Sequence, residues 1–150
     1  VLRKANPEDG TLRFHADARS PKVTQLDGGA VAVLAYHPAD QVQLRLAGTA
    51  RILTDGATVD GIWDASTLFA RRCYLAEHPP GTPLPGPGSG LPAWIEGQQP
   101  TPEQIVPARE NFATLWIGVT SIDWLHLANS GHRRAVFRAA DGWAGSWLAP

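Results

Sequence analysis

The chain has 150 residues, a formal net charge of −1 and a single cysteine, Cys73. This length favours one domain that buries about two thirds of its extended-chain surface. The balanced charge gives no overall attraction to nucleic acid or to a membrane surface, so we expect neither as a partner. One cysteine excludes an intrachain disulfide and a cysteine-based metal site, and it favours a reducing, cytoplasmic location.

The first residues indicate that the sequence starts inside a longer protein. No methionine occurs anywhere, and Val1-Leu2-Arg3 is typical of the end of a strand. We therefore expect the N-terminus of the domain to be truncated. No stretch has the length of a transmembrane helix, and the start lacks the apolar core of a signal peptide.

The segment 11–22 combines a strand, a helix start and several cations. The turn cluster at 6–10 predicts a hairpin between strands over 1–4 and 11–16. Ser20 at an N-cap and Pro21 at the first helical position predict a helix over 20–27. The N–H groups and partial positive charge of a helix start attract anions. Flanking basic residues thus favour a phosphate site, although solvated cations beside a surface helix are the commoner arrangement.

The next elements are predicted from their hydrophobic patterns. The apolar run 30–36 is typical of a strand buried on both faces. Residues 43–53 alternate as a second strand, in which Gly48 indicates either a bulge or the close approach of another group to the backbone. A helix is expected from Asp55 onward. Its predicted core residues share an amphipathic spacing: Val59, Ile62, Trp63 and Phe69.

Proline dominates the segment 77–107, which we predict to be one extended loop. Residues 78–92 alone hold six of the thirteen prolines, and a loop this long in a compact domain is usually a functional cover or partly disordered. Strand-like sequence resumes at Phe112 and continues over 133–138 and 145–148. Six or seven strands joined mostly by hairpins, with two short helices, predict a mainly β, antiparallel barrel with peripheral helices.

Familiar catalytic and metal-binding patterns are missing. The histidines are scattered without metal-ligand spacing, so no metal is expected. Neither a GxSxG nucleophile elbow nor a GxGxxG dinucleotide loop occurs. Cys73 follows Arg71-Arg72, which favours a lowered thiol pKa, but a lone cysteine is more often a small buried apolar residue. No catalytic residue is therefore predicted.

Taken in chain order, three stretches resemble the pyridoxamine 5′-phosphate oxidase-like family, the FMN-binding split β-barrel. They are LRFHADARSPK (12–22), QLRLAG (43–48) and the stretch from Asp123-Trp124 to Arg134. The resemblance implies a single FMN-binding split-barrel domain over 1–150. It also implies a homodimer with the flavin site at the interface, and a small-molecule substrate.

The resemblance implies FMN contacts from several parts of the chain. The residues that match or neighbour the family's cofactor motifs are Arg3, His15, Ala16, Arg19, Ser20, Lys22, Gln43, Ser89, Trp124 and Arg134. Lys22 takes the place of the lysine that binds the FMN phosphate. The adjacent arginine of the family falls on Pro21, so Arg19 is its expected substitute. Gln43 is expected to contact the isoalloxazine ring.

Other positions bear on the ring and on the substrate. Trp124 is expected to offer an aromatic surface, and Ser89 with Gly90 to contact the flavin from the proline-rich loop. His132 falls at a substrate-contacting position. The family's substrate-binding arginine falls on Ser130, and its Tyr, Arg and Ser substrate set has no clear counterpart, so oxidation of vitamin B6 is not implied.

Three hypotheses for the function follow from these observations. The first is an FMN-dependent oxidoreductase acting on an unidentified small molecule. The second is a non-catalytic flavin or haem carrier or sensor, which the altered substrate motif favours. The third is a deazaflavin-dependent reductase on the same fold. A dimer without any ligand is the simplest alternative to all three.

Overall fold

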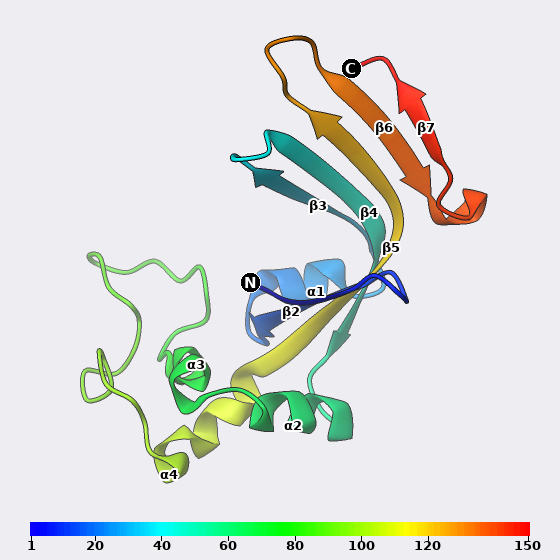
Figure 1. Ribbon diagram of the computed structural model, residues 1–150. Coiled ribbons are helices and arrows are strands. Elements are labelled where there is room, and N and C mark those ends of the chain that lie inside the picture. Colours follow the sequence, from blue (N-terminus) through cyan, green and yellow to red (C-terminus); the bar gives the residue numbers. More distant parts are fainter. The chain divides into compact units, whose positions relative to one another are not determined.

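The computed structural model describes residues 1–150, and its main feature is one seven-stranded sheet. The strand order is β1-β2-β5-β4-β3, with β6 paired to β5 and β7 paired to β6 (Figure 1). The strands are β1 (Leu2–Asn6), β2 (Thr11–Asp17), β3 (Ala30–His37), β4 (Val42–Leu53), β5 (Phe112–His126), β6 (Arg133–Arg138) and β7 (Gly145–Leu148). The β3–β4, β5–β6 and β6–β7 pairs are antiparallel. The predicted mainly β, antiparallel fold is confirmed.

The helices are all short. They are α1 (Pro21–Leu26), α2 (Ala57–Asp64), α3 (Leu68–Arg71) and α4 (Pro102–Ile105), with 3-10 turns η1 (Arg72–Leu75), η2 (Val106–Asn111) and η3 (Ala139–Asp141). None of them is long and apolar enough to cross a membrane. The prediction of loop up to residue 107 is wrong at its end, where α4 begins. Thr101 and Gln104 form a capping box around Pro102 there, a helix start hidden among the prolines.

The chain folds as two compact units. Unit 1 comprises Val1–Arg3, Phe14–Asp27 and Ile52–Leu115, and unit 2 comprises Lys4–Arg13, Gly28–Arg51 and Trp116–Pro150. Unit 1 therefore holds α1 to α4 and the proline-rich loop, whereas unit 2 holds β3, β6 and β7.

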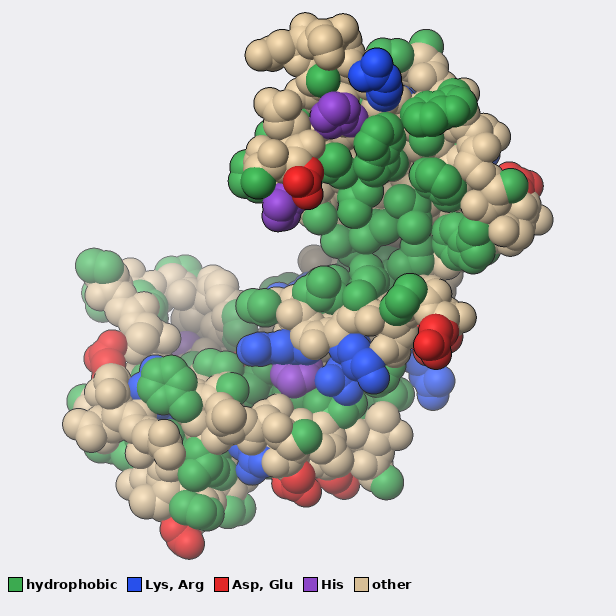
Figure 2. Space-filling model, viewed as in Figure 1, with side chains coloured by type: hydrophobic (Ala, Val, Ile, Leu, Met, Phe, Trp, Pro, Cys, Tyr) green, Lys and Arg blue, Asp and Glu red, His purple; other side chains and the backbone are tan.

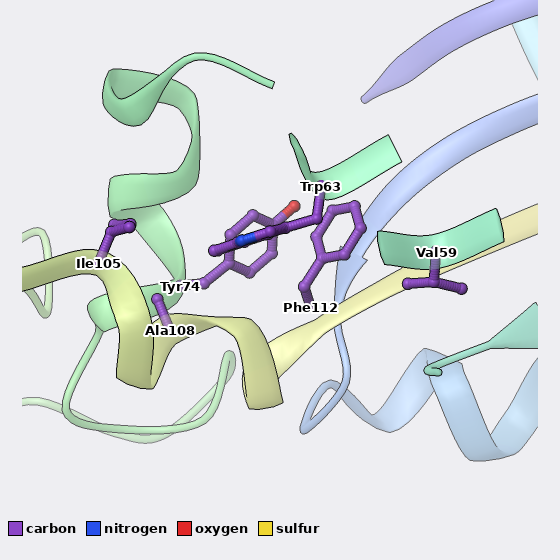
Figure 3. Close-up of a cluster of buried hydrophobic side chains, with 6 residues drawn as sticks. All are labelled: Val59, Trp63, Tyr74, Ile105, Ala108 and Phe112. Carbon is purple, nitrogen blue, oxygen red and sulfur yellow. The ribbon is translucent and has the colours of Figure 1, made fainter. Parts of the chain in front are cut away.

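An aromatic cluster forms the core of unit 1. The rings of Trp63, Tyr74 and Phe112 lie against one another, with centroids 5.1 to 5.9 Å apart, and Figure 3 shows them with the smaller side chains around them. Val59 and Trp63 are buried, as predicted. Phe69 is not, with 54% of its surface exposed. Because α2 ends at Asp64 and α3 starts afresh, the helical spacing from Val59 does not continue to Phe69.

The apolar strand β3 of unit 2 is exposed, which corrects the prediction that it is buried on both faces. Leu34 is 66% exposed and Tyr36 is 54% exposed. The physical reason is its place at the edge of the sheet, because β3 pairs only with β4. In Figure 2, hydrophobic side chains gather over the region of β3 to β7.

Gly48 marks a close approach of two backbones within unit 2. A Cβ atom at this position would overlap the carbonyl oxygen of Gly118 and lie 2.9 Å from its carbonyl carbon. Strand β4 runs through Gly48 without interruption. Of the two interpretations of this glycine, the close approach is confirmed.

Candidate functional site

Unit 1 contains a pocket of about 400 Å³, within the usual size range of small-molecule sites. Strands β1 and β2, the first turn of α1, η1 and the loop 76–90 all contribute to its lining. Four of its side chains are basic and one is a carboxylate: Arg3, His15, Lys22, His78 and Asp17. Pro79, Pro80, Leu84 and Tyr74 supply apolar surface. This combination suits an organic anion with an apolar body.

The pocket brings together half of the residues expected to bind the cofactor. Those that line it are Arg3, His15, Ala16, Lys22 and Ser89, and Gly90 lies beside Ser89 as expected. In Figure 2, Lys and Arg side chains lie next to a histidine in the region where Figure 1 places β2. Neither Arg3 nor Lys22 forms an ion pair, so both charges remain available to an anionic ligand.

Strand β2 fixes the position of His15 and Ala16. The backbone N–H of His15 donates to the carbonyl of Val1 at 3.4 Å, and its ring packs edge-on against Phe112 with centroids 5.0 Å apart. Ala16 is 6% exposed. The pocket side of β2 is thus supported directly by the aromatic core.

The predicted helix start at Ser20 is confirmed, but the helix is short and lacks a side-chain cap. Helix α1 has six residues with Pro21 at its first position, and Ser20 has extended backbone at the N-cap. The Ser20 hydroxyl makes no capping hydrogen bond, and the residue is buried. Because so short a helix has a weak dipole, attraction of an anion falls mainly to Lys22 and Arg3.

Arg19 is engaged inside the protein and does not line the pocket. Its Nε and Nη2 donate to the two carboxylate oxygens of Asp17 at 3.0 and 2.8 Å, and its Nη1 donates to the carbonyl of Ala76 at 2.9 Å. Donation of these hydrogen bonds to the Asp17 carboxylate raises the pKa of the Arg19 guanidinium. Asp17 and Ala76 therefore accept hydrogen bonds from the guanidinium that was expected to bind the phosphate.

Cys73 and Tyr74 line the pocket without an activated group. Cys73 is exposed, and its Sγ contacts the carbonyl of Ala70 at 3.2 Å. Desolvation raises the pKa of the Cys73 thiol, opposite to the lowering that the neighbouring arginines suggested. Burial likewise raises the pKa of the Tyr74 phenol. Both groups are thus protonated at neutral pH, and Cys73 is not the buried apolar residue that is usual for a lone cysteine.

The remaining predicted site residues belong to unit 2. Gln43 lies on β4 opposite Tyr36, and His132 is exposed between β5 and β6. Trp124 stacks on His126, with ring centroids 6.0 Å apart, and meets Trp147 edge-on at 6.3 Å.

Arg134 forms a two-pronged ion pair within unit 2. Its Nε and Nη2 donate to the carboxylate of Asp123 at 3.0 and 2.7 Å. These hydrogen bonds lower the pKa of Asp123 from its usual 3.8. Stabilisation from the pair is therefore present at neutral pH and is lost as the pH falls through the lowered pKa.

We expect Asp123→Asn to lower the urea midpoint of unfolding at pH 7, because Arg134 loses its charged partner. The difference from the wild type should shrink as the pH falls below about 4. Asp141→Asn is the matched control, since its contact with Arg138 is long, at 3.9 Å, and exposed. A deficit of Asp123→Asn that stays constant down to pH 2 would contradict this account.

The chain is similar in sequence and in fold to known FMN-binding proteins. Residues 1–54 match the sequence model described as pyridoxamine 5′-phosphate oxidase, FMN-binding domain. A crystal structure of a pyridoxamine 5′-phosphate oxidase-related, FMN-binding protein from Nostoc punctiforme is similar over 100% of this chain and 78% of its own, with 25% identity and a TM-score of 0.70. PhzG from Burkholderia lata, solved in complex with tetrahydrophenazine-1-carboxylic acid, is similar over 99% and 72%, with 15% identity and a TM-score of 0.69. Among curated proteins, a sequence search finds no match.

These similarities define an FMN-binding split-barrel fold. The predicted relationship to the pyridoxamine 5′-phosphate oxidase-like family is confirmed, by sequence over residues 1–54 and by fold over the whole chain.

Several pocket residues were not predicted. His78, Thr82 and Leu84 come from the proline-rich loop, and Cys73 and Tyr74 come from η1. The prolines indicated a loop that is either a functional cover or partly disordered, but irregular backbone has no period from which the direction of a side chain follows.

Proposed function

We propose that the unit 1 pocket binds FMN and that the protein is an oxidoreductase acting on a small organic molecule. The observation that carries the proposal is the pocket itself, which Lys22 and Arg3 both line without ion-pair partners. The family match over residues 1–54 supports it, because that range includes both cations.

The pocket residues fit the phosphate end of FMN. The ammonium of Lys22 and the guanidinium of Arg3 would hold the phosphate dianion through charge-assisted hydrogen bonds. Asp17, the one carboxylate in the lining, is paired with Arg19, which reduces its repulsion of an anion. Tyr74 is a protonated phenol with a hydroxyl to donate. Ser89 and Gly90 would approach the ligand from the loop.

Bound FMN would supply the exchange of one or two electrons with a substrate or an electron donor. The chain's own contribution is to bind and orient the cofactor. We propose that the second copy of the chain supplies the contacts to the isoalloxazine ring, with its Gln43 hydrogen-bonded to the polar edge and its Trp124 covering a face. No residue is proposed as a catalytic acid or base.

We propose that the protein acts as a homodimer and that the second copy helps to complete the flavin site. Exposed apolar side chains in unit 2 support an interface between copies. Leu34, Tyr36 and Trp147 are 66%, 54% and 74% exposed in the single chain, and so much exposed apolar surface is typical of surfaces that are covered by a partner. Sedimentation velocity tests this, with a monomer at micromolar concentration as the contradicting result.

Flavin titration of a lysine variant tests the cofactor. Lys22→Met is expected to raise the Kd for FMN by about 10- to 100-fold, since a charged hydrogen bond contributes about 1.5–3 kcal/mol. Riboflavin, which lacks the phosphate, should bind the variant and the wild type equally. Lys4→Met is the matched control, because Lys4 lies outside this pocket, and it should leave both values unchanged. A wild type that shows no saturable quenching of FMN fluorescence would overturn the proposal.

Steady-state turnover tests whether the bound flavin is used for catalysis. The oxidoreductase proposal requires that a reduced nicotinamide or another donor reduces the flavin and that an acceptor reoxidises it repeatedly. Flavin that stays bound but is never turned over would favour the carrier or sensor hypothesis instead.

A further inference from the structure

More than half of the residues that line the unit 1 pocket come from the loop 76–90. The loop carries the polar side chains of His78, Thr82 and Ser89 to the pocket, between prolines and glycines. The position of this loop therefore sets the shape and the polarity of a large part of the site.

Hydrogen bonds close the loop on itself. The N–H of Glu77 donates to the carbonyl of Gly90 at 2.9 Å, which joins its two ends. Within it, Thr82 donates from both its backbone N–H and its hydroxyl to the carbonyl of Pro79, at 3.2 and 2.8 Å. A closed loop of this kind moves largely as one piece, so what holds its base determines where its pocket-lining residues lie.

Two tethers hold the base of the loop to the turn that follows β2. In the first, Nη1 of Arg19 donates to the carbonyl of Ala76 at 2.9 Å, while Asp17 fixes the rest of the guanidinium. In the second, Nδ2 of Asn111 donates to the carbonyl of Tyr74 at 2.9 Å, and the Asn111 carbonyl accepts from the N–H of Ala18 at 2.8 Å.

We propose that Arg19 is a positioning residue for the cofactor site: it holds the loop 76–90 in place against the pocket and does not bind the phosphate. The proposal rests on the proposed flavin function for its ligand, but the loop geometry stands without it. A planar guanidinium can donate hydrogen bonds to a carboxylate from one edge and to a carbonyl from another. A lysine ammonium cannot make both sets of hydrogen bonds with the same geometry. Asp17 serves to aim this guanidinium at Ala76.

The test compares Arg19→Lys with Arg109→Lys. Arg109 is a close match, because its guanidinium donates to the carboxylate of Asp60 and, at 3.0 Å, to the carbonyl of Thr54. Its side chain is 25% exposed, like that of Arg19, and it does not line the pocket. A general loss of stability would therefore affect both variants alike.

Two readouts separate a positioning role from phosphate binding. Hydrogen exchange of the Glu77 amide, measured without flavin, should become about tenfold faster in Arg19→Lys and stay unchanged in Arg109→Lys. The Kd values for FMN and for riboflavin should both rise by about tenfold in this variant, because the displaced loop affects the whole site. Lys22→Met provides the contrasting pattern, in which only FMN binding weakens.

Other outcomes would overturn the proposal. Weakened binding of FMN alone, with exchange at Glu77 unchanged, would make Arg19 a phosphate ligand. Equal effects in Arg109→Lys would make the effect one of general stability. If the wild type binds neither flavin, the proposed function fails, and exchange at Glu77 alone decides the positioning role. Asn111→Ala, which removes the second tether, must reproduce the faster exchange if the base of the loop is what matters.

Discussion

Replacing Phe112 by alanine is expected to lower the free energy of unfolding by about 3–5 kcal/mol, measured by urea denaturation. Phe112 is 1% exposed, and its ring contacts the rings of Trp63 and Tyr74. The cavity left by the ring would lie between three elements, because these residues come from β5, α2 and η1. A loss of this size is a large part of the total stability of a domain.

The same substitution should also weaken the pocket. The ring of His15 packs edge-on against Phe112 at 5.0 Å, so its loss removes the support behind this pocket residue. Phe69→Ala is the matched control. Phe69 is 54% exposed and the centroid of its ring lies 4.1 Å from the guanidinium carbon of Arg72, so we expect a cost below about 1 kcal/mol. Similar losses in the two variants would contradict the assignment of the core.

Strand positions could be predicted from the sequence because alternation and turn residues are local signals. The strands over 133–138 and 145–148 match β6 and β7. Burial was harder to predict, as β3 shows. An apolar run such as 30–36 has the same sequence pattern whether this chain or another molecule covers it. In the single chain, Leu34 is exposed.

The candidate site was predictable where family motifs lie on regular structure. Lys22 and His15 flank one turn at the end of β2, and the pocket includes both. Arg19 shows the limit of motif matching. A basic residue beside a phosphate motif suggests that its side chain binds phosphate. In the structure, however, the Arg19 side chain donates to the carbonyl of Ala76, which is 57 residues further along the chain. No local pattern in a sequence reports such a contact.

A methyl group added at Gly48 is expected to destabilise the protein strongly, by about 3 kcal/mol or more. The added Cβ would overlap the carbonyl of Gly118, which is backbone and cannot rotate away as a side chain would. Relief would require the backbones of β4 and β5 to separate. The hydrogen bond from the Thr120 hydroxyl to the carbonyl of Ala47, at 3.2 Å, would be strained as they part.

Gly118→Ala is the matched control for this close approach, because the two glycines face each other but differ in the space around them. A Cβ at Gly118 would meet nothing within 4 Å, so this substitution should be neutral or slightly stabilising, by about 0.4–1 kcal/mol through the unfolded state. Thermal unfolding of both variants measures the difference. Equal melting temperatures would show that the two strands have room to move apart. A large difference would show that position 48 requires glycine because the backbones touch, and that the exposed Gly118 is not needed for packing.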